Sequence, residues 1–167
     1  PDAAAKRISE KYLTTPRKAS LAVTVSRAED RLIRPELRRT CSVYIGIPFC
    51  PSRCSYCSFV SYTSPKLLSL IPDYLTALRT NIHTVFETIR ELGLKLSTVY
   101  IGGGTPTVLN ESQLQFLLEA VTQETDVSRL EEFTLEAGRP DTITKEKLLI
   151  AKNMGVSRIS VNTQTLN

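Results

Sequence analysis

Hydrophobic and polar positions follow two alternating patterns from residue 42 onward. Short runs rich in β-branched and aromatic residues are typical of buried β-strands, and the first of them, SVYIGIP, is stopped by Pro48. Between these runs lie longer segments whose apolar residues recur at the i, i+3, i+4 spacing of one helix face. The patterns predict strands over 42–48, 97–103, 132–138 and 157–163, and helices over about 73–92, 110–124 and 144–155.

Signals at the helix ends support these boundaries. Gly93 and Gly155 suit helix ends, because glycine readily adopts the left-handed conformation that often follows a helix. Asn110 is a natural N-cap for the second helix. The apolar stripe of the first helix is expected to consist of Leu75, Leu78, Ile82, Val85, Phe86 and Ile89. Strands that alternate with helices at this spacing predict right-handed βαβ units, and therefore an α/β fold with a parallel sheet.

Four parallel strands on their own would leave an edge of unpaired backbone groups. We therefore expect a partial (β/α) barrel, an N-terminal portion of about four βα units, rather than a finished domain. The lack of an initiator methionine and the ending at Asn167 in mid-pattern also suggest a piece of a longer protein. In such barrels, function gathers where strands end, so the candidate loops are PFCPSRCSYCSF, GGGTPT and AGRPDT.

Charge separates the beginning of the chain from its body. The net charge is +4, but residues 1–40 alone hold ten Lys or Arg against five Asp or Glu. We expect a basic, largely helical lead-in over 1–41 and the N-terminal part of the barrel over 42–167. An acidic partner or nucleic acid would explain the charge, but without interleaved aromatic residues a solvated helix is favoured. No apolar run approaches the roughly 20 residues of a membrane span.

Cys50, Cys54 and Cys57 lie on one short segment, CPSRCSYC. A disulfide framework is disfavoured in a chain without secretory features, and a redox pair of the last two thiols would leave Cys50 unexplained. Structural zinc needs four ligands, but Cys41 lies before the strand and the only histidine, His83, is expected on a solvated helix face. An iron–sulfur cluster fits better, because three thiolates can hold three corners of a four-iron cube. The fourth iron then stays open for a chelating ligand.

The CxxxCxxC spacing of this segment resembles the motif of the radical S-adenosylmethionine (SAM) superfamily. The resemblance implies a 4Fe-4S cluster bound by the three cysteines, with SAM chelating the open iron. In that family an electron from the cluster cleaves SAM to a 5′-deoxyadenosyl radical, which abstracts hydrogen from a substrate. GGGTPT resembles the glycine-rich motif of the family, so Gly103, Gly104 and Thr105 are implied to take the methionyl end of SAM. A branched side chain at Gly104 is expected to block that approach and to spare the cluster.

The resemblance narrows to one branch over about residues 42–167. VYIGIPFCPSRCSYCSF, YIGGGTPT, FTLEAGRPDT and GVSRISVNTQTLN follow, in order and spacing, the branch of oxygen-independent coproporphyrinogen III oxidase (coproporphyrinogen dehydrogenase). Within this branch, the chain looks most like HemZ-type proteins. The resemblance implies an oxidoreductase of haem biosynthesis that decarboxylates coproporphyrinogen III to protoporphyrinogen IX. A haem-trafficking chaperone on the same scaffold is the alternative, and RNA modification is a third option supported only by the basic lead-in.

The resemblance also implies partners and a location. A porphyrinogen or haem would be the substrate, and a reductant such as flavodoxin or ferredoxin would supply electrons. Because air destroys such clusters, the expected location is the reducing cytoplasm. The remaining C-terminal part of the barrel would complete the enzyme, so this fragment alone is expected to be inactive.

Further residue roles follow from the same resemblance. Tyr44 corresponds to a tyrosine that packs against cluster and SAM, and Tyr56 to an aromatic residue on the adenine side. Glu136 and Gln164 would make polar contacts to SAM; the alternatives are an ion pair inside the barrel and an ordinary loop position. No side chain is assigned a catalytic role. Alternation supports an inward Glu136 independently, because the apolar residues Phe133, Leu135 and Ala137 would face the helices.

Two positions depart from established coproporphyrinogen oxidases. Those enzymes have a further cysteine where this chain has Phe59, and a histidine where it has Gly46. Phe59 is shared with the haem-chaperone and HemZ-type relatives. Both departures weaken the assignment of coproporphyrinogen as substrate and leave cluster and SAM binding intact.

Overall fold

The computed structural model describes residues 2–33, 35–59 and 61–164. The chain divides into two compact units, Pro1–Arg38 and Arg39–Asn167. The first is a helical pair, α1 (Ala3–Tyr12) and α2 (Pro16–Asp30), that buries Ala5, Ala19 and Val23. A 3₁₀ turn, η1 (Pro35–Arg39), precedes the first strand. The division falls slightly before the expected boundary at residues 41 and 42, because the first strand begins at Thr40.

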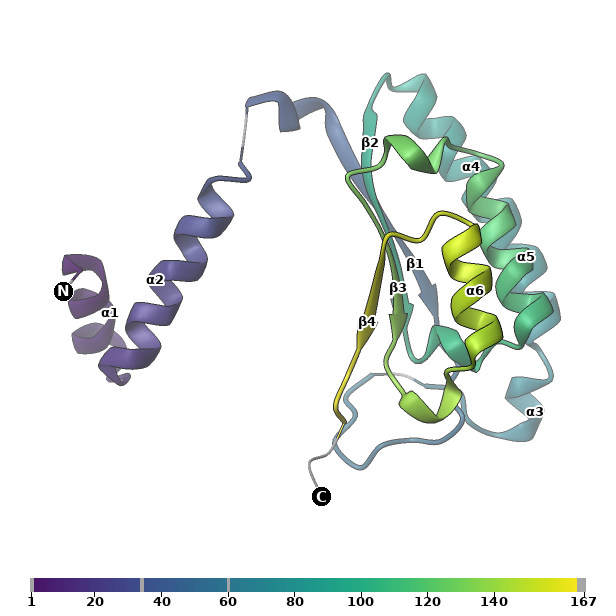
Figure 1. Cartoon of the computed structure of the whole chain (residues 1–167), viewed down its shortest axis with the longest axis horizontal. Helices are drawn as coiled ribbons and strands as arrows, with labels where there is room; N and C mark the ends of the chain where they lie inside the picture. The colour runs from purple at the N-terminus through teal and green to yellow at the C-terminus, as the bar shows by residue number, and fades with distance from the viewer. Residues whose placement is uncertain (1, 34, 60, 165–167) are drawn as a thin grey trace. The chain divides into compact units, whose positions relative to one another are not determined.

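The second unit contains the predicted parallel sheet. Its strands are β1 (Thr40–Ile47), β2 (Lys95–Gly103), β3 (Glu132–Ala137) and β4 (Arg158–Val161), and they pair in the order β1-β2-β3-β4. All three pairings are parallel. The helices α4 (Ile71–Glu91), α5 (Glu111–Thr122) and α6 (Lys145–Asn153) lie together on one face of the sheet (Figure 1). The predicted α/β fold of a part-barrel is confirmed.

Short elements occupy the connections between strands and helices. The helix α3 (Pro65–Leu68) precedes α4, and 3₁₀ turns follow β2 and β3 as η2 (Pro106–Val108) and η4 (Pro140–Thr142). A further turn, η3 (Val127–Arg129), leads into β3. The turns η2 and η4 directly follow the carboxyl ends of β2 and β3, so they shape that edge of the unit.

The core lies between the sheet and these helices. Ile45 and Ile47 from β1, Val99 and Ile101 from β2 and Leu135 from β3 are all at most 3% exposed. From the helices, the core receives Leu75, Ile82, Phe86, Leu114, Leu117, Leu118 and Val121. The period-two pattern of the strands therefore places one set of side chains in the core and the other on the opposite face.

Helix ends agree with the sequence signals, whereas one core assignment is wrong. Asn110 caps α5 in a capping box with Gln113, and Gly93 and Gly155 both have a positive φ. Val85 was expected in the apolar stripe of α4 but is 43% exposed. It directly precedes the buried Phe86, and one step along a helix turns a side chain by about 100°, so Val85 lies beyond the edge of the buried stripe.

The open face of the sheet carries tyrosines and small residues. The rings of Tyr44 and Tyr100 stack at a centroid distance of 5.6 Å. Glu136 lies on the same side, opposite Phe133 and Leu135 in the core, as the alternation predicts. Among the described residues, no helix is both long and apolar enough to cross a bilayer.

His83 lies exposed on α4, as predicted, and is paired with acidic groups. Its Nδ1 lies 2.7 Å from a carboxylate oxygen of Glu124, and its Nε2 lies 3.4 Å from Glu87. The hydrogen bond with Glu124 is the main cause that raises the pKa of His83; Glu87 adds to it and Arg90 opposes it. Partial burial acts to raise the pKa of Glu124, but hydrogen bonds from His83 and Arg90 hold it below its usual value.

This pairing predicts a pH-dependent contribution of His83 to stability. A raised pKa in the folded state means that protonated His83 stabilises the fold below its unfolded pKa, and that this effect disappears as pH rises through the folded pKa. The Tm difference between wild type and His83→Gln should therefore be larger at about pH 5.5 than at about pH 9. Thermal unfolding at the two pH values measures it, and equal differences would contradict the pairing.

Candidate cluster and cofactor site

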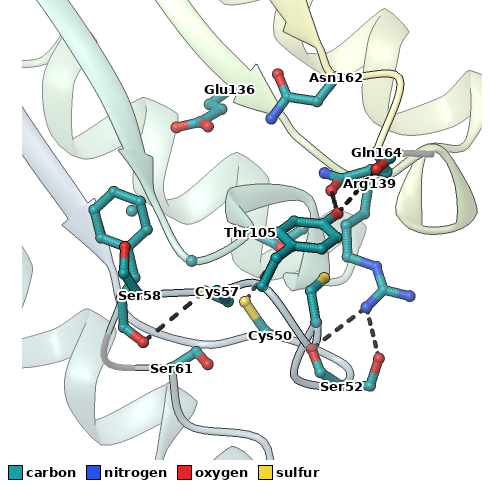
Figure 2. A pocket seen from close by; sticks show the side chains of 15 residues that line it. Cys50, Ser52, Cys57, Ser58, Ser61, Thr105, Glu136, Arg139, Asn162 and Gln164 are labelled. Atoms are coloured by element: carbon teal, nitrogen blue, oxygen red, sulfur yellow. Dashed lines mark hydrogen bonds between the residues drawn. The ribbon is translucent and has the colours of Figure 1, made fainter.

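A pocket opens at the carboxyl ends of the strands, where the segments that follow all four strands meet (Figure 2). The segment after β1 carries the cysteines, the one after β2 is the glycine-rich turn, and the segments after β3 and β4 complete the wall. Nine of the ten residues predicted for the site line this pocket: Cys50, Cys54, Tyr56, Cys57, Gly103, Gly104, Thr105, Glu136 and Gln164. Positions from 50 to 164 are thus gathered in one place by the parallel topology.

The cysteine loop is closed at its base by backbone hydrogen bonds. The N–H of Cys50 donates to the Tyr62 oxygen at 3.1 Å, and the N–H of Tyr62 donates to the Pro48 oxygen at 2.8 Å. The loop therefore leaves β1 and returns beside it, and its thiols project into the pocket. Cys50 is buried at 7% exposed, while Cys54 and Cys57 are half-buried. All four thiols of the chain are free.

The environment of Cys50 disfavours an isolated thiolate. Burial raises the pKa of the Cys50 thiol, and the neighbouring Cys57 and Cys54 act in the same direction. A 3.3 Å hydrogen bond with the Thr105 hydroxyl and the charge of Arg139 oppose this rise. A bound metal centre would supply positive charge that stabilises the thiolate of Cys50, and a thiol that coordinates a metal is deprotonated outright.

The glycine-rich turn packs directly against the base of the cysteine loop. The N–H of Gly104 donates to the Ile47 oxygen at 2.7 Å, and the N–H of Thr105 donates to the Phe49 oxygen at 2.9 Å. A Cβ on Gly104 would lie 2.7 Å from the Phe49 oxygen and 2.9 Å from the Cys50 Sγ. Gly103 has φ +114°, a conformation that only glycine adopts without strain. Neither glycine can therefore take a side chain without a shift at the base of the cysteine loop, and we call this close-packed turn the glycine cradle.

Tyr56 and Gln164 meet across the pocket. The Tyr56 hydroxyl donates to the side-chain oxygen of Gln164 and to its backbone oxygen, the latter at 3.2 Å. The Gln164 amide also donates to the Gly138 oxygen. Gln164 has φ +59°, which is uncommon for a residue other than glycine, and backbone strain of this kind is often found at functional sites.

Tyr44 is the one predicted site residue that does not line the pocket. Stacking on Tyr100 holds it on the open face of the sheet, close to Glu136. A Cβ built on Gly102 would meet the Tyr44 hydroxyl at 3.0 Å and a Glu136 oxygen at 2.6 Å, so these groups converge over a glycine. Partial burial, and then the negative charge of Glu136, raise the pKa of Tyr44 and of Tyr100.

Sequence reasoning missed several residues of the wall, above all Arg139, Ser52 and Asn162. Arg139 lies in the AGRPDT loop, which was expected at this edge, but nothing in its local pattern indicates where the side chain turns. Ser61 also lines the pocket, and its buried hydroxyl has no hydrogen-bond partner among the residues that the structure describes.

The three thiols surround the pocket instead of meeting at one point. Within the described parts of the chain, no three Cys, His, Asp or Glu side chains are close enough to share a single metal ion. A four-iron cubane needs no such convergence, because each thiolate binds a different iron. The free thiols, the glycine cradle beside Cys50 and the unpartnered Ser61 hydroxyl fit a thiolate-bound cluster.

Comparisons with known proteins agree with this geometry. The radical SAM superfamily matches residues 44–167. The oxygen-independent coproporphyrinogen-III oxidase-like protein HemZ of Bacillus subtilis is 40% identical over 125 residues, which are 74% of this chain and 25% of that protein. The heme chaperone HemW of B. subtilis is 41% identical over 126 residues, 74% of this chain and 32% of that protein.

A solved structure matches the fold as well. The coproporphyrinogen III oxidase HemN of Escherichia coli, described as a radical SAM enzyme, aligns with a TM-score of 0.65 and 28% identity. The match covers 77% of this chain and 29% of that protein. The chain thus spans about a quarter to a third of the length of these relatives. Membership of their family implies a 4Fe-4S cluster and SAM as cofactors. The chain belongs to the radical SAM superfamily, in the branch of the coproporphyrinogen oxidase-like proteins.

Proposed function

We propose that this chain is the cluster- and SAM-binding part of a radical SAM oxidoreductase that acts on a porphyrinogen. The observation that carries the proposal is the meeting of three free thiols with a glycine-rich turn in one pocket. Cys50, Cys54 and Cys57 hold three irons of the cluster. Residues 42–167 form the N-terminal part of the barrel, and residues 1–41 are a basic lead-in outside the site.

The remaining wall of the pocket suits SAM. Gly103, Gly104 and Thr105 line the pocket with Cys50 and receive the methionyl end, because the two glycines bring bare backbone to the pocket wall. Glu136 offers a carboxylate to the ammonium group or the ribose hydroxyls of SAM, in addition to its hydrogen bond with Tyr100. Tyr44 supports Glu136 from the sheet face.

Tyr56 and Gln164 contribute the opposite wall. The aromatic ring of Tyr56 lies against the adenine side, and Gln164 adds a polar contact to SAM. Their mutual hydrogen bond links the cysteine loop to the segment after β4. Such a link orders two loops before the cofactor arrives, which lowers the entropic cost of binding.

The proposed reaction is the oxygen-independent oxidative decarboxylation of coproporphyrinogen III to protoporphyrinogen IX in haem biosynthesis. When bound, the cluster and SAM supply the one-electron chemistry that removes hydrogen from a propionate side chain. The residues of this chain hold both groups in place and exclude water and oxygen from them. Similarity to HemN and HemZ supports this substrate. The electron donor would be a flavodoxin or ferredoxin in the cytoplasm, and the rest of the barrel is needed for activity.

A haem chaperone on the same scaffold is the second candidate. It is favoured by Phe59, which stands where established oxidases have a further cysteine and which is 65% exposed at the pocket. The identity of 41% to the heme chaperone HemW points the same way. On this alternative the protein binds haem and passes it on, with no turnover of porphyrinogen.

An anaerobic assay of the reconstituted full-length protein separates the two functions. With coproporphyrinogen III, SAM and a reductant, the oxidase should release 5′-deoxyadenosine and a divinyl porphyrinogen, both identified by mass. The Cys54→Ala variant is the matched negative control. Stable stoichiometric haem binding without those products would favour the chaperone. Failure of both turnover and haem binding would contradict both candidates.

A further inference from the structure

Arg139 ties the cysteine loop to the loop after β3. Its Nη1 donates hydrogen bonds to the backbone oxygen of Ser52 at 3.3 Å and to the Ser52 hydroxyl at 2.6 Å. Ser52 lies between Cys50 and Cys54 in the chain, so this contact holds the loop between two of its thiols (Figure 2). We call Ser52, Arg139 and Asp141 the loop clamp.

The other side of the guanidinium is fixed by Asp141. Nε lies 3.0 Å from one carboxylate oxygen and Nη2 lies 2.6 Å from the other, which is the bidentate geometry of a strong ion pair. The backbone is fixed too: Pro140 begins η4, and the N–H and hydroxyl of Thr142 donate to the Arg139 oxygen at 3.0 Å and 2.8 Å. The clamp is therefore anchored in the turn that follows β3.

These contacts leave Arg139 little capacity to bind a ligand. A guanidinium has five N–H donors, and the hydrogen bonds to Ser52 and Asp141 engage most of them. Its positive charge nevertheless interacts with Cys54 and Cys50. Only 20% of its side chain is exposed, so this interaction is partly shielded from solvent.

We propose that Arg139 is a positioning residue of the cluster site, resting on the function proposed above. Through Ser52 it holds the cysteine loop in the arrangement that binds three irons. Its guanidinium lines the same pocket as the three cysteines, where its positive charge stabilises the more negative, reduced state of the cluster. The clamp thus makes the cluster harder to lose and easier to reduce.

The test compares three variants of the full-length protein after anaerobic reconstitution. Arg139→Gln removes the positive charge and the bidentate guanidinium. We expect iron to be held about 10- to 100-fold less tightly against a chelator, which is typical when a residue that orients the metal ligands is lost. A redox titration followed by electron paramagnetic resonance should give a more negative midpoint potential. Arg139→Lys should keep the potential near that of wild type but lose iron faster, because lysine lacks the bidentate fork. Ser52→Ala should lose iron at an intermediate rate, since the backbone contact remains.

Arg129→Gln is the matched control, because Arg129 also pairs with an aspartate close in sequence, Asp126, but lies outside the pocket. It should behave as wild type. Unchanged iron retention and potential in Arg139→Gln would overturn the clamp while leaving the cluster site intact. Failure of the wild type itself to take up iron would instead overturn the proposed function. If Arg139→Gln does not fold, Arg139→Lys and Ser52→Ala decide: iron retention equal to wild type in both refutes the clamp.

Discussion

Replacing Cys54 with alanine should remove most of the iron and the brown colour from the protein after anaerobic reconstitution. With one thiolate gone, only Cys50 and Cys57 remain in the pocket to hold a cluster that needs three protein ligands. No other Cys or His side chain lies in the pocket wall to replace the lost thiolate among the described residues. Iron and sulfide analysis, together with the absorption spectrum, measures the loss.

Cys41→Ala is the matched control for this prediction. Cys41 is also a free, half-buried thiol of the same unit, but it lies near the start of β1, at the end of the strand away from the pocket. Its removal should leave iron content unchanged. Full retention of iron in Cys54→Ala, or equal losses in both variants, would contradict the assignment of the ligands. So would zinc in place of iron in the wild-type protein.

The sheet was predictable because its strands and helices have distinct periods. Strand boundaries were less so: β1 and β2 each begin two residues before the predicted start, where Thr40 pairs with Lys95. Thr40 and Lys95 are polar, so they do not extend the apolar pattern of either strand. They belong to the sheet because they pair with each other across it. At the other end of the sheet, β4 stops at Val161, before the predicted residue 163.

The gathering of the site was predictable for a topological reason. In a parallel sheet every strand ends at the same edge, so loops that are distant in the sequence must meet there. What periodicity does not reveal is the direction in which a particular side chain turns. Arg139 reaches Ser52 across 87 residues of sequence, and Tyr44 is held by Tyr100 on the sheet face. Contacts of this kind depend on tertiary packing, which no local pattern records.

Gly104→Ala should weaken both iron and SAM binding, which is more than the sequence alone predicts. From sequence, a side chain here only blocks the approach of SAM and spares the cluster. In the structure, the added carbon would lie 2.9 Å from the Cys50 Sγ and 2.7 Å from the Phe49 oxygen. A backbone oxygen cannot rotate away from such a contact as a flexible side chain can. The cysteine loop must therefore shift, which costs about 1–3 kcal/mol of folding free energy.

Gly46→Ala separates this effect from a general intolerance of the strands to alanine. Gly46 lies in β1, and a Cβ there would meet only the Tyr44 ring within 4 Å, at 3.8 Å, an ordinary contact. Iron content after reconstitution and SAM affinity by anaerobic equilibrium dialysis should therefore stay near wild type in Gly46→Ala. Both should fall in Gly104→Ala, while circular dichroism shows the same helix content. A loss of SAM affinity with full iron retention would mean that the cradle serves SAM alone. Wild-type values for both would show that the turn after β2 does not support the thiols at all.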